Sequence, residues 1–123
     1  MQKEESITRN HRVNTRVLSR LHAIGGKPLL SQLIDLHLDR CEKSLSHIED
    51  ACENGDWESA MLHTRNVRIF SEEIGTEEDV PYITDLEETL SEKDGSRVIN
   101  ELKRIREVLK CDEKQLKLYL DSV

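Results

Sequence analysis

Aromatic residues, proline and long apolar runs are scarce in this chain. Only 3% of its 123 residues are aromatic and only two are proline, so aliphatic side chains must build any hydrophobic core. No run approaches the roughly 18 consecutive apolar residues of a membrane span. The start of the chain has no apolar stretch typical of a signal peptide. We therefore expect a cytoplasmic protein that neither spans nor binds a membrane.

Positive charge is also in deficit. The chain has 18 basic and 25 acidic residues, for a formal net charge of −7. Proteins that bind nucleic acids need a basic surface, so we expect no nucleic-acid partner. The sequence contains no glycine-rich phosphate loop, no G-x-S-x-G motif and no carboxylate pair that helix geometry singles out for acid–base catalysis. We expect no enzyme activity and no cofactor.

Metal-binding patterns are equally weak. The three cysteines, Cys41, Cys52 and Cys111, form no CxxC pair, which predicts free thiols rather than a disulfide framework or a zinc knuckle. His37 and Cys41 are four residues apart and would share a helix face. Metal sites in helical bundles take carboxylates and Glu-x-x-His pairs from several helices, and the sequence has no Glu-x-x-His. We expect no metal site.

Leucine, isoleucine and valine, by contrast, recur at the 3.6-residue spacing of helices. Strands would require alternating β-branched and aromatic residues. Residues 1–10 are polar and unpatterned, so we expect a flexible N-terminal tail followed by a single domain over residues 11–123. Four long amphipathic helices with short connections predict an all-α, antiparallel four-helix bundle with a short additional N-terminal helix.

Capping and breaking residues indicate where the helices begin and end. The start of the fourth helix is ambiguous, because either Thr76 or Asp79 could cap it and Pro81 is awkward deep inside a first turn. We expect a short helix capped by Asn14 and ended by Gly25-Gly26, and a long helix that begins at Pro28 and stops at Asn54-Gly55. The next helix should run from Trp57 to Ile74 with Asp56 as its cap, and the fourth should have the core residues Ile83, Leu86 and Leu90. The last helix should run from about Ser96 to Leu120, with the apolar stripe Val98, Ile99, Leu102, Ile105, Leu109 and Leu116.

The segment from Gly55-Asp56-Trp57 through Arg65–Ser71 to Ile74-Gly75 is the most distinctive part of the sequence. It resembles the signature helix of histidine phosphotransfer (HPt) domains, which belong to two-component phosphorelays. Weaker similarity at Leu18–Gly26 and Asp85–Leu90 extends the resemblance over about residues 14–120. The family's phosphorylated histidine stands ten residues after the turn glycine and ten before the closing glycine, and both counts reach Arg65. The resemblance implies a bundle of the HPt type.

Arginine at this position removes the family's chemistry. Phosphotransfer needs an imidazole nitrogen with a free lone pair, whereas arginine stays protonated and offers only donors. Ile69 replaces the small residue that lets a partner's active site approach closely. His63 lies two residues from Arg65, a rotation of roughly 200° around the helix, and shares the apolar arc instead. We therefore expect a non-catalytic adaptor or inhibitor, a pseudo-HPt protein.

Binding need not be lost with catalysis. The arc opposite the core is expected to face water and to form a docking patch for a response-regulator receiver domain or a hybrid sensor kinase. We expect the protein to be a monomer or a weak dimer. The residues of the patch are Arg65, Arg68, Ile69, Met61, Leu62 and Glu72.

Other interpretations stay open. The arginines of the patch could simply be solvated while its apolar residues cover a neighbouring loop. The chain could be an active phosphotransfer protein that uses His63 after local rearrangement of the helix, or a helical interaction or dimerisation module unrelated to phosphorelays. An active protein could instead use another exposed histidine, although none stands in a His-x-Leu-Lys-like setting; these alternatives are His11, His22, His37 and His47.

Overall fold

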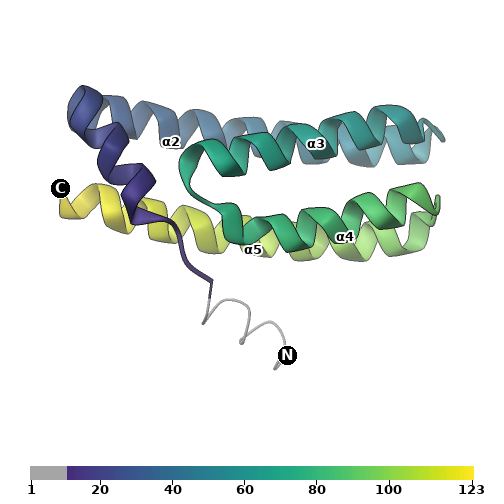
Figure 1. The fold of residues 1–123 in the computed structure, drawn as a ribbon. Coiled ribbons are helices and arrows are strands. Elements are labelled where there is room, and N and C mark those ends of the chain that lie inside the picture. The colour runs from purple at the N-terminus through teal and green to yellow at the C-terminus, as the bar shows by residue number, and fades with distance from the viewer. Residues whose placement is uncertain (1–10) are drawn as a thin grey trace.

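All regular structure in the described part of the chain, residues 11–123, is helical in the computed structural model (Figure 1). The predicted all-α class is therefore confirmed. The predicted flexible tail, residues 1–10, lies outside the described residues. The elements are α2 (Thr15–Glu53), α3 (Trp57–Ile74), the 3-10 turn η1 (Glu77–Asp79), α4 (Val80–Ser91) and α5 (Gly95–Ser122).

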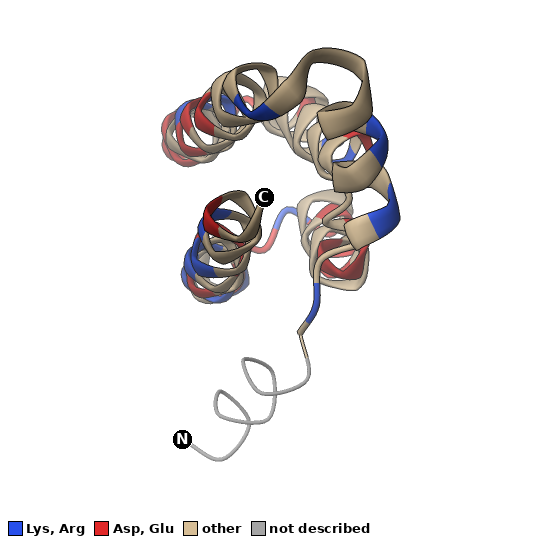
Figure 2. Cartoon of the chain, turned by 90° about the vertical axis from the view of Figure 1, so that its left-hand side faces the viewer, with Lys and Arg blue, Asp and Glu red and all other residues tan. Residues whose placement is uncertain are grey.

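The four long helices form a bundle. Helix α2 packs against α3 and α5, and α4 packs against the same two helices, so the four surround a common interior. Figure 1 shows α2 and α3 as one layer and α4 and α5 as the other. In the end-on view of Figure 2, acidic residues lie on all four helices, whereas basic residues lie on α2, α3 and α5. The bundle therefore carries its charge on every side rather than on one face.

Helix α2 contains two helical segments that meet at Gly26. The side chain of Asn14 caps the first segment by accepting a hydrogen bond from the Arg16 N–H. Gly26 then adopts φ 73° and ψ −171°, a conformation that glycine tolerates because it lacks a Cβ. Pro28 follows in the first turn of the second segment. The break expected at Gly25-Gly26 is thus present, and it produces the short N-terminal helix.

The cap predicted for α3 occupies its cap position, since Asp56 accepts a hydrogen bond from the Ser59 N–H. Asp94, which was not predicted as a cap, accepts one from the Arg97 N–H at the start of α5. The ambiguous start of α4 is divided between two elements: Thr76 precedes η1, and α4 begins at Val80. Pro81 therefore lies in the first turn of α4, where its missing N–H removes no intrahelical bond.

One prediction about the core of α5 is wrong. Ile99 was assigned to the buried stripe, but its side chain is 58% exposed. Val98 already faces the interior, and the next residue is turned about 100° around the helix, toward the surface between α5 and α2. Val108, which was not in the predicted stripe, is buried instead. The stripe is therefore rotated slightly from its predicted position.

Candidate functional site

Helix α3 places Arg65 on its outer side. The buried row of this helix consists of Ala60, Thr64, Val67, Ser71 and Ile74. Arg65 follows directly after Thr64 and is exposed. No hydrogen bond or ion pair joins its guanidinium to another residue within 11–123. The charge of Arg65 is therefore available to a partner.

Two apolar side chains flank Arg65 on the same surface. Leu62 is 57% exposed and Ile69 is 50% exposed, one turn before and one turn after Arg65. Glu72 is also exposed, one turn beyond Ile69. Exposed aliphatic side chains that lie close together form an apolar surface of the kind that partners cover. We call Leu62, Arg65 and Ile69 the Arg65 patch.

Two residues expected in this patch have other environments. Met61 is half-buried and packs against the main core cluster, because it lies on the side of α3 that is turned toward α4. Arg68 is half-buried as well. Its guanidinium donates a hydrogen bond to Thr84 Oγ1 at 3.0 Å and pairs with the Glu87 carboxylate, both on α4. The predictions that Met61 and Arg68 face water are therefore wrong, since α4 lies within reach of both.

A surface groove adjoins the Arg65 patch. It has a volume of about 660 Å³ and lies between the first half of α3 and the end of α4. Trp57, Met61, Leu62 and Leu90 supply its apolar lining, and Arg65 stands at its edge. An apolar side chain inserted beside Arg65 would find room there.

His63 lies on another side of α3 from Arg65. Its ring is half-buried and stacks on the ring of His47 in α2, with 4.8 Å between the ring centroids and 19° between the ring planes. The imidazole is thus turned toward α2. A partner that approached the Arg65 patch would not meet it.

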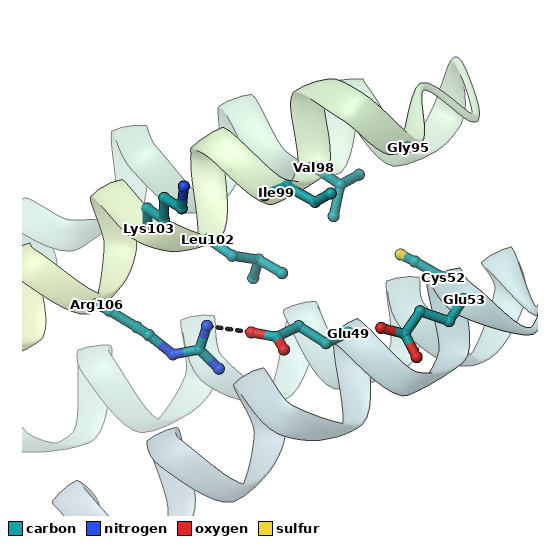
Figure 3. Close-up of a pocket in the computed structure, with 9 residues that line it drawn as sticks. All are labelled: Glu49, Cys52, Glu53, Gly95, Val98, Ile99, Leu102, Lys103 and Arg106. Carbon is teal, nitrogen blue, oxygen red and sulfur yellow. Dashed lines mark hydrogen bonds and ion pairs between the residues drawn. The ribbon is translucent and has the colours of Figure 1, made fainter.

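A second groove, of about 510 Å³, lies between α2 and α5 (Figure 3). Val98, Ile99 and Leu102 line one side of it. Arg106 reaches from α5 to α2, where it pairs with Glu49 and lies 3.6 Å from Glu42. The sequence did not predict this groove, because it depends on how far apart the two helices lie.

The structure also brings together three titratable residues that the sequence did not place near one another. His11 precedes α2, Asp79 ends η1 and Asp112 lies in α5, yet all three side chains are buried. His11 Nε2 lies 2.6 Å from Asp112 Oδ1 and 2.8 Å from Asp79 Oδ1. Asp112 carries the only signal in the sequence, since it stands on the apolar stripe of α5, four residues from both Val108 and Leu116.

Burial and charge compete within this cluster, which we call the His11 triad. Burial by itself lowers the pKa of His11, but the hydrogen bond to Asp112 and the nearby carboxylate of Asp79 outweigh it and raise the pKa to about 10. Burial raises the pKa of Asp112, while His11 pulls it down. The triad therefore retains protons at neutral pH. Ser71 Oγ donates a long hydrogen bond, 3.5 Å, to Asp79 Oδ2.

The segment before α2, residues 11–14, is held to the bundle by its backbone as well. The N–H of Asn14 donates to the Gly75 carbonyl at 2.7 Å, and that of Val13 donates to Gln115 Oε1 at 3.0 Å. The Gln115 amide donates in turn to the His11 carbonyl. These bonds position the His11 ring between η1 and α5.

The two candidate metal ligands on α2 remain a pair. His37 and Cys41 are buried, with both ring nitrogens of His37 3.8 Å from Cys41 Sγ. Burial lowers the pKa of His37 and raises that of Cys41 to about 12, so the thiol stays protonated. Among residues 11–123, no third ligand joins this pair in a metal-binding cluster.

Comparison of the chain with protein-family models, with curated proteins and with solved structures gives no match. Within the described residues, none of the helices is both long and apolar enough to cross a membrane.

Proposed function

We propose that this chain is a pseudo-HPt protein, an antiparallel four-helix bundle of the HPt type that acts in a cytoplasmic two-component phosphorelay without transferring phosphate. In this proposal it is an adaptor or inhibitor that docks the receiver domain of a response regulator, or a hybrid sensor kinase, through the Arg65 patch. The observation that carries the proposal is the position of Arg65. It replaces the family's histidine in the matched register and is exposed and unpaired within the described residues.

The chemistry of arginine supports binding rather than transfer. A guanidinium has five N–H donors and no acceptor, so it cannot take up a phosphoryl group as a relay histidine does. It can form two parallel hydrogen bonds to a carboxylate. The HPt resemblance implies a partner with an acidic pocket ringed by apolar surface. Arg65 would pair with the carboxylates of that pocket, in the place of a metal ion or phosphoryl group.

The surroundings of Arg65 fit such a partner. Leu62 and Ile69 would meet the apolar ring, and the groove beside Trp57 and Leu90 could accept a protruding side chain. Because Arg68 pairs with Glu87, it would connect α3 to α4 beside the patch rather than contact the partner. The patch thus combines one free cation, as judged within residues 11–123, with a small apolar surface.

Binding and phosphoryl transfer should be measured together. The full chain is incubated with a panel of receiver domains, each with and without its aspartyl phosphate, and complexes are detected by calorimetry. We expect one receiver to bind without loss of its phosphate to the chain. Arg65→Ala should weaken that complex, whereas Arg104→Ala, which changes an exposed arginine of α5, should not.

Transfer of labelled phosphate to the chain would contradict the proposal. If label moves from a receiver to the chain, survives base, is lost in acid and disappears in His63→Ala, the protein is an active phosphotransfer protein. In that case His63 would have to leave its stack with His47 to reach the partner.

A further inference from the structure

We propose that His11, Asp79 and Asp112 bind a divalent transition-metal ion, with zinc as the preferred ion. The three residues come from three separate elements and are 5%, 2% and 0% exposed. One ligand atom from each lies within 4.8 Å of the others. The chain therefore converges on this point from segments that are up to 101 residues apart.

Hydrogen bonding inside the triad leaves oxygens unsatisfied. The Nε2 of His11 can carry one proton, and that proton is directed to Asp112 Oδ1. Among residues 11–123, Asp79 Oδ1 lies 2.8 Å from the same nitrogen but has no hydrogen-bond partner, and Asp112 Oδ2 has none either. Buried carboxylate oxygens are normally paired, because their desolvation is otherwise uncompensated. A cation between the side chains would satisfy both.

The donor set indicates the class of ion. Two carboxylate oxygens and one imidazole nitrogen suit zinc and similar transition metals, whereas magnesium and calcium prefer oxygen ligands alone. The triad would release its protons to solvent as the ion binds, and two carboxylates and a neutral imidazole would then balance a divalent cation. Zinc at about 2.0–2.2 Å from each ligand keeps ligand atoms roughly 3–3.6 Å apart. The present separations of 2.6 and 2.8 Å would need to widen by less than about 1 Å.

The bound ion would cross-link three parts of the fold. His11 begins the segment that leads into α2, Asp79 lies in the turn between α3 and α4, and Asp112 lies in α5. An ion held by all three would tie this segment to the bundle. Binding would then stabilise the folded state, because the unfolded chain does not bring the ligands together.

The test uses the full chain, stripped with a chelator and reloaded with zinc chloride. We expect one zinc ion per chain after gel filtration, measured by mass spectrometry. We also expect a rise in Tm of about 10 °C when zinc exceeds its Kd a hundredfold. Asp112→Asn and His11→Gln, which keep side-chain size and polarity, should abolish both effects. His47→Ala should change neither, since His47 is exposed and lies outside the triad.

Cobalt provides a readout that does not depend on the variants folding. In the wild-type chain, Co²⁺ should give the ring protons of His11, and of no other histidine, the large contact shifts of a coordinated imidazole. Substoichiometric zinc in the wild-type chain would overturn the proposal. So would zinc retained by Asp112→Asn, or a thiolate-to-cobalt absorption band, which would place the ion at a cysteine such as Cys41.

Discussion

The contact between the segment before α2 and the end of α3 predicts unequal effects of two glycine substitutions. Gly75 ends α3 with φ 89°, and its carbonyl accepts the N–H of Asn14. A Cβ at Gly75 would lie 2.9 Å from the Asn14 carbonyl oxygen and 3.1 Å from Val17 Cβ. Gly55 has a similar φ of 71°, but a Cβ there would have no atom from elsewhere in residues 11–123 within 4 Å. The two positions share their backbone strain and differ in their surroundings.

The difference between them can be estimated. Alanine in the left-handed conformation costs about 1–2 kcal/mol, which applies to both Gly55→Ala and Gly75→Ala. Overpacking adds about 1–3 kcal/mol at Gly75 alone, because the Asn14 backbone must move. Gly75→Ala should therefore lower the free energy of unfolding by about 2–5 kcal/mol, and Gly55→Ala by about 1–2 kcal/mol.

Urea denaturation followed by circular dichroism measures both values. The slope of the free energy against urea should be the same for the two variants, so that midpoints can be compared directly. Equal destabilisation, to within roughly 0.5 kcal/mol, would refute the close approach of Asn14 to Gly75. It would also remove the geometric basis for placing His11 against η1 and α5.

Three further predictions concern an ion pair, a helix cap and a buried thiol of the bundle. A double-mutant cycle of Arg68→Ala and Glu87→Ala should give a coupling of about 0.5–1 kcal/mol, since the pair is only half-buried; no coupling would contradict the ion pair. Asp56→Ala should lower stability by about 1 kcal/mol through loss of its hydrogen bond to the Ser59 N–H, and an unchanged denaturation midpoint would contradict that cap. Burial raises the pKa of Cys41 to about 12, so alkylation at pH 8 should modify Cys41 only at the rate of unfolding, as peptide mapping can show; rapid modification would contradict its burial.

The sequence was most informative where a property depends on local chemistry. Asn14 and Asp56 occupy the cap positions that their short polar side chains favour. Gly26 and Gly75 adopt positive φ where the helical pattern breaks. The exposure of Arg65 also followed from the helical period of α3, because its apolar neighbours fix which side faces the core.

Sequence reasoning failed where a neighbouring helix determines the environment. Met61 and Arg68 share the outer half of α3 with Arg65, but α4 covers the first and pairs with the second. The contact of His11 with Asp112 joins residues 101 apart, and no spacing rule predicts it. A helical period gives the direction of a side chain around its own helix. It does not give the position of the neighbouring helix.

The proposed role of Arg65 is tested most directly by one comparison of dissociation constants. The receiver domain that binds best is titrated with the wild-type chain and with Arg65→Ala, with Arg104→Ala as the matched control. Loss of a central arginine from an interface predicts a Kd about 10–100-fold weaker for Arg65→Ala and an unchanged Kd for the control. Equal affinity of all three chains would contradict docking through the Arg65 patch.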